Sequence, residues 1–223
     1  MTAYRRIDPA ATTRAVPARP AASALDKARG FSAATLHEAG GKIGALPESI
    51  KPMAPSFRLC GPAVTVQSPP GDNLWLHRAL YQAQPGDVLV VTVAGQHDHG
   101  YWGEVMSTAA KARNLGGLVL DACVRDGVLL EQIGFPVFAR GLCIRGTGKD
   151  FAAPGWINYP ILLGSVVVNA GDLIVGDGDG VVAIPAARID AVLATAAQRD
   201  REEAAILKRL AAGEKTLDIY GWS

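Results

Sequence analysis

The feature that most constrains the fold is an alternation of strand-like and helix-like segments between residues 63 and 141. Four segments have the short apolar or alternating pattern of strands: AVTVQS (63–68), VLVVTV (88–93), LVLDA (118–122) and PVFARG (136–141). Segments of helical character lie between them: 73–87, which Asn73 is expected to cap, 103–117 and 125–134. This order predicts a parallel or mixed sheet with helices packed against it.

The chain changes character after residue 155. GSVVVNAGDLIVGDGDGVVAIP (164–185) contains three short β runs separated by AGD and DGDG, which are both strong turn signals. A helix from about Ala186 to Ala212 should follow, with GEKTLDIYG as a tail. A helix layer together with a strand-rich second half predicts one α+β domain, in which sheet packs on sheet between flanking helices.

The predicted domain spans residues 23–223, behind an N-terminal extension of residues 1–22. The stretch VPARPAASA (16–24) is rich in proline and alanine, which favours a disordered or arm-like extension. Two short helical pieces are expected within 23–41, with Ser23 and Ser32 as N-caps and Gly40-Gly41 as the stop.

Charge and cysteine content exclude several classes of protein. The chain has 22 basic and 21 acidic residues without a block of one sign, so nothing favours electrostatic capture of nucleic acid or a membrane. No apolar run approaches the ~18–20 residues that span a bilayer. Cys60, Cys123 and Cys143 lie far apart and form no C-x-x-C pair, which argues against a disulfide framework or a zinc ribbon. A reducing cytoplasm is the expected location.

The stretch LVLDACVRDG (118–127) carries the first chemical signal. It ends an apolar run with Arg125-Asp126, and ligands of α/β proteins gather at the carboxyl ends of strands. The alternative is a purely structural role, in which Asp126 caps the next helix and Arg125 lies on the surface.

A second carboxylate strengthens the functional interpretation. Glu104 begins the preceding helix, twenty residues before Arg125. If both helices start at one sheet edge, Glu104 and Asp126 face each other across a cleft, as a hard cation such as Mg²⁺ or Mn²⁺ requires. Arg125 could then grip a substrate carboxylate, and the free amides of Val105 and Met106 could bind the same anion.

Other polar residues fit structural roles better. His97, Asp98 and His99 share one short loop, which rarely supplies three convergent metal ligands. His77 could line the cleft, but packing is the favoured role. GTGKD (146–150) lacks the spacing of a phosphate loop, so a turn is favoured, although its lysine could bind a second substrate carboxylate. Cys123 has no histidine partner nearby in sequence and is expected to be a buried apolar residue.

From about residue 25 onward the chain resembles a known family, the class II pyruvate aldolases. The resemblance runs through FSAATLHEAGGKIGALP, CGPAVTVQSPPGDNLWLHRAL, GYWGEVMSTAAKARNLGGLVLDACVRDG, GFPVFARGLCIRGTGKD, GDLIVGDGDGVVAIP and LAAGEKTLDIYG. These enzymes cleave 4-hydroxy-4-methyl-2-oxoglutarate and 4-carboxy-4-hydroxy-2-oxoadipate in the catabolism of aromatic acids. The family also contains the non-catalytic RraA regulator of RNase E, so a protein-binding regulator is the alternative function.

The resemblance implies a fold and a site. The fold is the RraA-like swivelling β/β/α architecture. Asp126 would ligate Mg²⁺ or Mn²⁺, with Glu104 acting through a water, and Arg125 with the amides of Gly103, Val105 and Met106 would hold the oxo-acid end. A metal-stabilised pyruvate enolate would form, and oxaloacetate decarboxylation would be a side activity. The family pattern ends in a further acid three residues after Asp126, but this chain has Leu129 there.

The resemblance also implies a homo-oligomer, either a trimer or two stacked trimers. In the family a glutamate from the C-terminal helix of a neighbouring subunit completes the site. Glu202 and Glu203 are the candidates here, and Glu203 fits the local pattern EAAI better.

Overall fold

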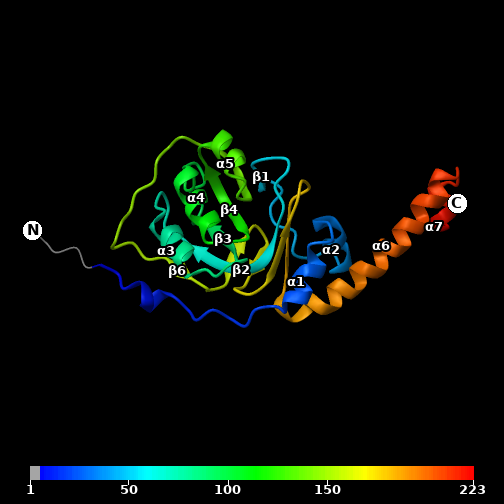
Figure 1. Cartoon of the computed structure of the whole chain (residues 1–223), viewed down its shortest axis with the longest axis horizontal. Coiled ribbons are helices and arrows are strands. Elements are labelled where there is room, and N and C mark those ends of the chain that lie inside the picture. Colours follow the sequence, from blue (N-terminus) through cyan, green and yellow to red (C-terminus); the bar gives the residue numbers. More distant parts are fainter. Residues whose placement is uncertain (1–5) are drawn as a thin grey trace, which may run out of the picture.

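The computed structural model describes residues 6–223, which form a body of sheet and helices from which both chain ends depart (Figure 1). The strands are β1 (Lys51–Pro52), β2 (Leu59–Gln67), β3 (Val88–Thr92), β4 (Gly117–Val124), β5 (Val137–Leu142), β6 (Trp156–Ile157), β7 (Ile161–Leu163), β8 (Val166–Val168), β9 (Leu173–Gly176) and β10 (Val181–Ile184). The α-helices are α1 (Ala22–Ala28), α2 (Ala33–Ala39), α3 (Leu74–Gln82), α4 (Glu104–Ala112), α5 (Gly127–Ile133), α6 (Ile189–Ala211) and α7 (Thr216–Tyr220). Short 3₁₀ helices cover Pro9–Thr12 and Ala186–Arg188.

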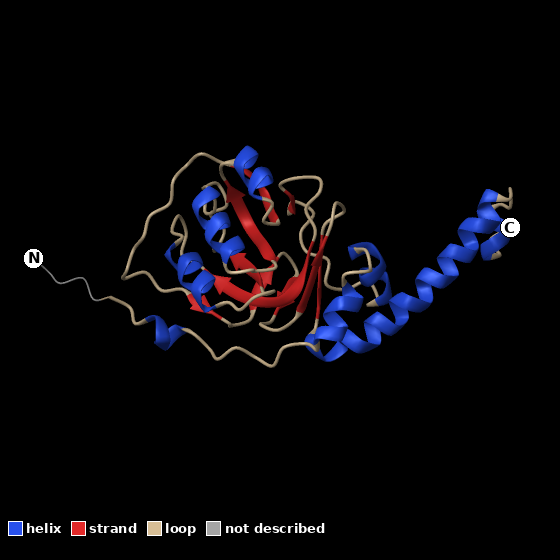
Figure 2. Ribbon diagram, in the orientation of Figure 1, coloured by secondary structure: helices blue, strands red, loops and turns tan. Residues whose placement is uncertain are grey.

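The main sheet has the strand order β1-β5-β4-β3-β2-β9-β10, with β6 pairing to β2. Strands β2 to β5 are parallel, as the alternation of segments predicts. The long strand β2 serves two parts of the sheet, because Leu59–Pro62 pair antiparallel with β9 whereas Ala63–Gln67 pair parallel with β3. The sheet therefore curves along β2 and nearly closes, and helices flank it (Figure 2).

The small sheet of β7 and β8 supplies Ile161, Leu163 and Val168 to the same core as the main sheet. Sheet thus packs on sheet, and the predicted fold class is confirmed. The predicted hairpin at 176–180 is also present, since β9 and β10 pair antiparallel and the amide of Asp177 donates to Gly180 O at 3.0 Å.

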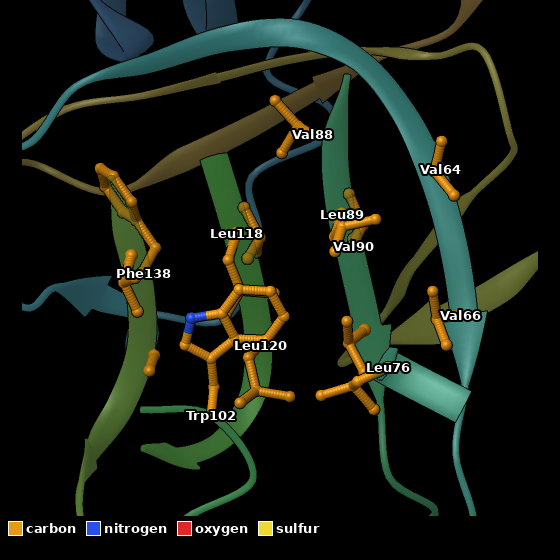
Figure 3. Close-up of a cluster of buried hydrophobic side chains, with 14 of the residues drawn as sticks. Val64, Val66, Leu76, Val88, Leu89, Val90, Trp102, Leu118, Leu120 and Phe138 are labelled. Atoms are coloured by element: carbon orange, nitrogen blue, oxygen red, sulfur yellow. The ribbon is translucent and has the colours of Figure 1, made fainter. Parts of the chain in front are cut away.

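The core holds the parallel strands rigidly. Figure 3 shows apolar side chains of β2, β3 and β4 near three larger ones. These are Leu76 of α3, Trp102, which precedes α4, and Phe138 of β5, and all of them are buried. Burying each aliphatic or phenyl side chain of this kind contributes about 1.5–3 kcal/mol. A second apolar cluster lies beneath α1, α2 and the first half of α6. The carboxyl ends of β3, β4 and β5 are therefore fixed relative to one another.

The predicted helix caps are partly right. Ser32 caps α2, because its Oγ accepts a hydrogen bond from Thr35 N at 2.9 Å, and α2 ends against Gly40. The prediction for Ser23 is wrong, because α1 already begins at Ala22 with Ala21 at the N-cap.

The N-terminal extension is an ordered arm from residue 6 onward, and residues 1–5 lie outside the described part. Ile7 N donates to Phe151 O at 2.9 Å, and Arg14 N donates to Ile157 O at 3.1 Å. Arg19 forms an ion pair with the buried Asp87. From residue 6 onward the extension is thus bonded to the body at these three points.

The C-terminal helix lies on the body only along its first half. Ile189, Val192, Leu193 and Ala196 are buried against α1 and α2, whereas residues 198–211 project away from the body (Figure 1). The expected tail contains a further helix, α7. Within residues 6–223 we find no helix with the length and apolarity that crossing a membrane requires.

Candidate functional site

Asp126 has an unusual backbone conformation at the carboxyl end of β4. Its φ of 62° and ψ of 37° lie in the left-handed region, which is uncommon for a residue with a side chain. Aspartate tolerates this conformation better than most residues, yet the local cost is still about 1 kcal/mol. The strained turn ends β4 and starts α5 within two residues, so Arg125 and Asp126 both project at the sheet edge.

The Asp126 carboxylate caps a different helix from the one predicted. It occupies the N-cap position of α5, but its side chain makes no cap there. Instead Oδ2 accepts a hydrogen bond from Glu104 N, the first residue of α4, at 3.0 Å. Gly103 permits this approach, because a Cβ atom at this position would lie 2.3 Å from Asp126 Oδ2. The start of α4 and the Asp126 carboxylate therefore meet at one place, while the convergence of the two carboxylates on a metal ion stays a prediction.

Arg125 is fixed at its backbone and free at its side chain. Its amide donates to Trp102 O at 2.9 Å, and Nε lies 3.6 Å from Asp126 Oδ2. Half of the side chain is exposed to solvent. Gly100 leaves room for the Arg125 side chain, because a Cβ atom at position 100 would lie 2.5 Å from Cys143 O and 3.1 Å from Arg125 Cβ. The guanidinium can thus reach a ligand beside the Asp126 carboxylate.

A cleft of about 300 Å³ opens over these residues. Its lining comprises Asn73, His77, Gly100, Tyr101, Trp102, Gly103, Glu104, Val105, Met106, Arg125, Gly146, Thr147 and Lys149. The amides of Val105 and Met106 precede the first hydrogen bond of α4, in which Ser107 N donates to Gly103 O at 3.0 Å. The side chains of Arg125 and Lys149 are cationic, and the N-terminus of the nine-residue helix α4 lies at the same cleft. This arrangement suits an anionic ligand.

Lys149 reaches the cleft on a loop that is held to the start of α3. Gly148 N donates to Gly71 O at 2.7 Å, and Asp150 N donates to Asp72 Oδ2 at 2.5 Å. The sequence interpretation favoured a simple turn for residues 146–150. Only the long-range bonds to residues 71 and 72 show why this turn carries Lys149 into the cleft.

Asn73 is a further member of the cleft that sequence reasoning missed, and His77 is a member for which packing was the favoured alternative. His77 is half-buried at the cleft, where burial and the nearby positive Lys149 lower its pKa, while Asp72 acts in the opposite direction. Asn73 stands at the start of α3 as expected, but its side chain makes no cap bond. Asp72 does this instead, since its Oδ1 accepts a hydrogen bond from Leu74 N at 2.7 Å.

Other candidate residues lie elsewhere or have structural partners. Glu203 is exposed in the half of α6 that projects from the body (Figure 1), and it is not among the residues that line the cleft. Asp98 pairs with Arg145, and His97 Nδ1 lies 2.5 Å from Asp121 O. Cys123 is half-buried, not fully buried as expected, and burial raises the pKa of its thiol.

The donor atoms at the cleft fit a hard divalent cation better than zinc. Among residues 6–223 no group of three or more histidine, cysteine, aspartate or glutamate side chains could hold a metal ion. Mg²⁺ and Mn²⁺ need fewer, because they commonly use one or two carboxylates and fill the remaining positions with water and substrate. Asp126 can provide Oδ1, which has no hydrogen-bond partner in the described part of the chain, and the exposed Glu104 carboxylate lies at the same helix start.

Comparison with known proteins finds a family model that matches most of the chain. Residues 21–183 match the family model described as RraA-like, Aldolase/RraA. A protein of Halalkalibacterium halodurans named "Putative 4-hydroxy-4-methyl-2-oxoglutarate aldolase" is 38% identical over 160 residues, which cover 72% of this chain and 75% of that protein.

Solved structures show the same fold. An uncharacterized protein of Pseudomonas syringae pv. tomato superposes with a TM-score of 0.78 at 28% identity, covering 89% of this chain and 92% of that one. RraAS2 of Streptomyces coelicolor, named as an unusual member of the RNase ES inhibitor RraA protein family, gives a TM-score of 0.73 at 26% identity, covering 83% of this chain and 96% of that one. The matched relatives thus include both an aldolase name and an inhibitor name.

Proposed function

Because the chain belongs to the RraA-like family, we propose that it is a divalent-metal-dependent aldolase that releases pyruvate from a 4-hydroxy-2-oxo acid. The name of the Halalkalibacterium relative supports the aldolase activity at the level of the family. The single observation that carries the proposal for this chain is the meeting of Arg125, Lys149 and the start of α4 beside the Asp126 carboxylate.

The oxo-acid end of the substrate would bind at α4. The guanidinium of Arg125 can form two parallel hydrogen bonds to a carboxylate, and Gly103, Val105 and Met106, whose amides would bind the same group, line the cleft. Because the arginine side chain is half exposed and has only a 3.6 Å contact to Asp126, it keeps hydrogen-bonding capacity for a ligand.

Asp126 would hold Mg²⁺ or Mn²⁺ directly, and Glu104 would do so through a water. Such a cation supplies Lewis-acid stabilisation of the negative charge that develops on the oxo-acid during the reaction. The chain contributes the strained turn that presents Asp126 and the Glu104 amide that fixes one of its oxygens.

The cleavage itself is a retro-aldol step. The C4 hydroxyl loses its proton, the C3–C4 bond breaks, its electron pair remains on the pyruvate part as an enolate, and C4 becomes a carbonyl. Glu104 is the one carboxylate among the residues that line the cleft, so it is the acceptor of that proton through a water. Arg125 would stabilise the enolate charge. Oxaloacetate would reach the same enolate by losing CO₂, which requires no hydroxyl proton to be removed.

Lys149 extends the proposal to substrates with a further carboxylate. It lines the same cleft as Arg125, so the two cations can bind carboxylates at different ends of one molecule. The favoured substrates are therefore 4-carboxy-4-hydroxy-2-oxoadipate, which yields pyruvate and oxaloacetate, and 4-hydroxy-4-methyl-2-oxoglutarate, which yields pyruvate. A homotrimer, or two stacked trimers, with Glu203 of one subunit at the cleft of the next is part of this proposal.

A coupled assay with lactate dehydrogenase tests the function. We expect pyruvate from both substrates and from oxaloacetate in the presence of Mg²⁺ or Mn²⁺, and loss of all three activities with EDTA. An absence of pyruvate from both hydroxylated substrates with either cation would contradict the proposal.

The second candidate is a non-catalytic regulator of a ribonuclease. The name of the Streptomyces structure and Leu129 at a position that is acidic in the aldolase pattern favour it. Inhibition of a ribonuclease by the purified chain, together with the absence of pyruvate release, would support the regulator and reject the aldolase.

A further inference from the structure

Asn73 holds a buried hydrogen-bond acceptor beside the cleft. The residue is only 7% exposed and lines the cleft at the start of α3. Its Oδ1 atom is buried and has no hydrogen-bond partner within residues 6–223. Buried polar side-chain atoms nearly always have a partner, so a buried acceptor without one in a cleft suggests that a ligand or a water completes it.

The orientation of the Asn73 amide is set by its other contacts. Nδ2 donates to Tyr101 O at 2.9 Å and contacts Met106 Sδ at 3.6 Å. Exchanging the oxygen and nitrogen would place two acceptors against each other at Tyr101 O, so Oδ1 is the free atom. Tyr101 is itself fixed, because its hydroxyl donates to Gln96 O at 2.6 Å and accepts from Gly71 N at 2.7 Å.

The free atom can bind only a hydrogen-bond donor. A carboxylate of the substrate is an acceptor and would be repelled, whereas a hydroxyl or a water can donate to Oδ1. Met106, which contacts Asn73, lies in the first turn of α4 only two residues after Glu104. The acceptor therefore stands near the helix start where the proposed proton acceptor is located.

We propose that Asn73 Oδ1 anchors the water that receives the C4 hydroxyl proton and passes it to Glu104. This inference rests on the proposed aldolase function. The water donates one O–H to Asn73 and accepts the hydroxyl proton on its oxygen, then releases a proton to the Glu104 carboxylate. As positive charge develops on the water, its hydrogen bond to Asn73 strengthens, so the interaction favours the transition state. Asn73 is thus a positioning residue for the proton transfer.

Two reactions of the same enzyme separate this role from a structural one. Aldol cleavage must remove a hydroxyl proton, whereas oxaloacetate decarboxylation does not. Asn73→Leu keeps the approximate size and removes the acceptor, so kcat for cleavage should fall about 10- to 100-fold. Oxaloacetate decarboxylation should stay within about twofold of wild type, and so should pyruvate affinity measured by calorimetry with Mg²⁺, because Arg125 and α4 bind that part of the substrate.

A second variant guards against a folding defect. Asn73→Gln retains both the amide donor and the acceptor oxygen, so it should restore at least part of the cleavage rate that Asn73→Leu loses. Parallel loss of both reactions in Asn73→Leu, or unchanged cleavage, would overturn the role of Asn73. Failure of the proposed function gives a different result, because the wild-type protein would then release no pyruvate from either hydroxylated substrate.

Discussion

The two ends of the parallel strands carry similar residues but differ in how those residues are used. At the amino end a cavity of about 360 Å³ is lined by Arg29, Phe31, Arg58, Leu59, Cys60, Gly86, Gly116, Val175, Gly176 and Asp177. At the carboxyl end the cleft of about 300 Å³ contains Arg125, Lys149 and the glycines around α4. Both ends therefore combine basic residues and close-packed glycines, and an aspartate adjoins each.

Asp177 and Asp126 show the difference most clearly. Each accepts a hydrogen bond from the first amide of a helix in another part of the chain, Ala33 N at 2.8 Å and Glu104 N at 3.0 Å. The second oxygen of Asp177 also accepts from Asp179 N at 3.0 Å, and only 7% of its side chain is exposed. The Asp126 side chain is 32% exposed and binds through Oδ2 alone.

The pKa values of one residue at each end are also shifted in ways that bear on this comparison. Burial raises the pKa of Cys60, at the amino end, to about 11, so its thiol stays protonated and unreactive at neutral pH. At the carboxyl end, burial and Lys149 lower the pKa of His77, which keeps that imidazole neutral in the cleft. Charged residues occur at both ends of the strands and therefore do not identify the functional site. The carboxyl end is identified by hydrogen-bonding groups that remain available to a ligand.

The largest expected effect is on Asp126. Asp126→Asn preserves the acceptor for Glu104 N and removes the negative charge, so kcat/KM for pyruvate release should fall by at least about 100-fold. The melting temperature should change little, because the group is partly exposed. Steady-state kinetics and thermal unfolding measure the two effects.

Asp177→Asn is the matched control for that change. It should leave kcat/KM unchanged and reduce stability by about 1–3 kcal/mol, since the buried amide of Ala33 or the partly buried amide of Asp179 loses its acceptor. If both substitutions reduced activity equally, the contrast between the two strand ends would be wrong.

Arg125→Lys should have the next largest effect. Lysine keeps the charge but loses the planar pair of donors, so kcat/KM should fall about 10- to 100-fold. Arg58→Lys changes an exposed arginine at the amino end in the same way and should have no effect on the same assay. Wild-type kinetics in Arg125→Lys would remove the guanidinium from the proposed site.

Lys149→Met should discriminate between substrates. It removes a cation while keeping a long side chain, so KM should rise about 5- to 20-fold for the tricarboxylic substrate. The rise should be smaller for oxaloacetate, which has fewer groups to bind at that end. An equal change for both would mean that Lys149 does not recognise a carboxylate that only the tricarboxylic substrate carries.

The last expected effect is on stability and not on activity, and it is a pH-dependent loss at the amino end. Burial raises the pKa of Asp87, while the Gln84 amide and Arg19 oppose the rise. Arg19→Met should raise this pKa further and cost about 1–3 kcal/mol at pH 7. A carboxyl with a raised folded-state pKa favours the folded state at low pH, and this contribution is lost as pH rises. The cost should therefore shrink toward pH 4.5 in urea unfolding; a constant or growing cost would contradict it.

Periodic and local signals of the sequence predicted most of the fold. The alternation of strands and helices, the hairpin at 176–180, and the position of Arg125-Asp126 opposite Glu104 all follow from patterns within a few residues or one β-α-β unit. The curvature of β2 and the pairing of β6 could not be predicted in this way, because they depend on contacts between distant segments.

The site was predicted less completely than the fold. Lys149, His77 and Asn73 enter the cleft through bonds that join residues 71–73 to the loop at 146–150, and no local pattern indicates that pairing. The side chain of Asp126 caps α4 instead of α5 for the same reason, since only the packed sheet edge brings the two helix starts together.

Calorimetric titration with Mn²⁺ tests the central claim most directly, because it measures the site without any assumption about the substrate. The account predicts one Mn²⁺ site per chain in the wild-type protein, its loss in Asp126→Asn and its retention in Asp177→Asn. Equal Mn²⁺ affinity in all three proteins would show that the free oxygen of Asp126 does not hold the cation.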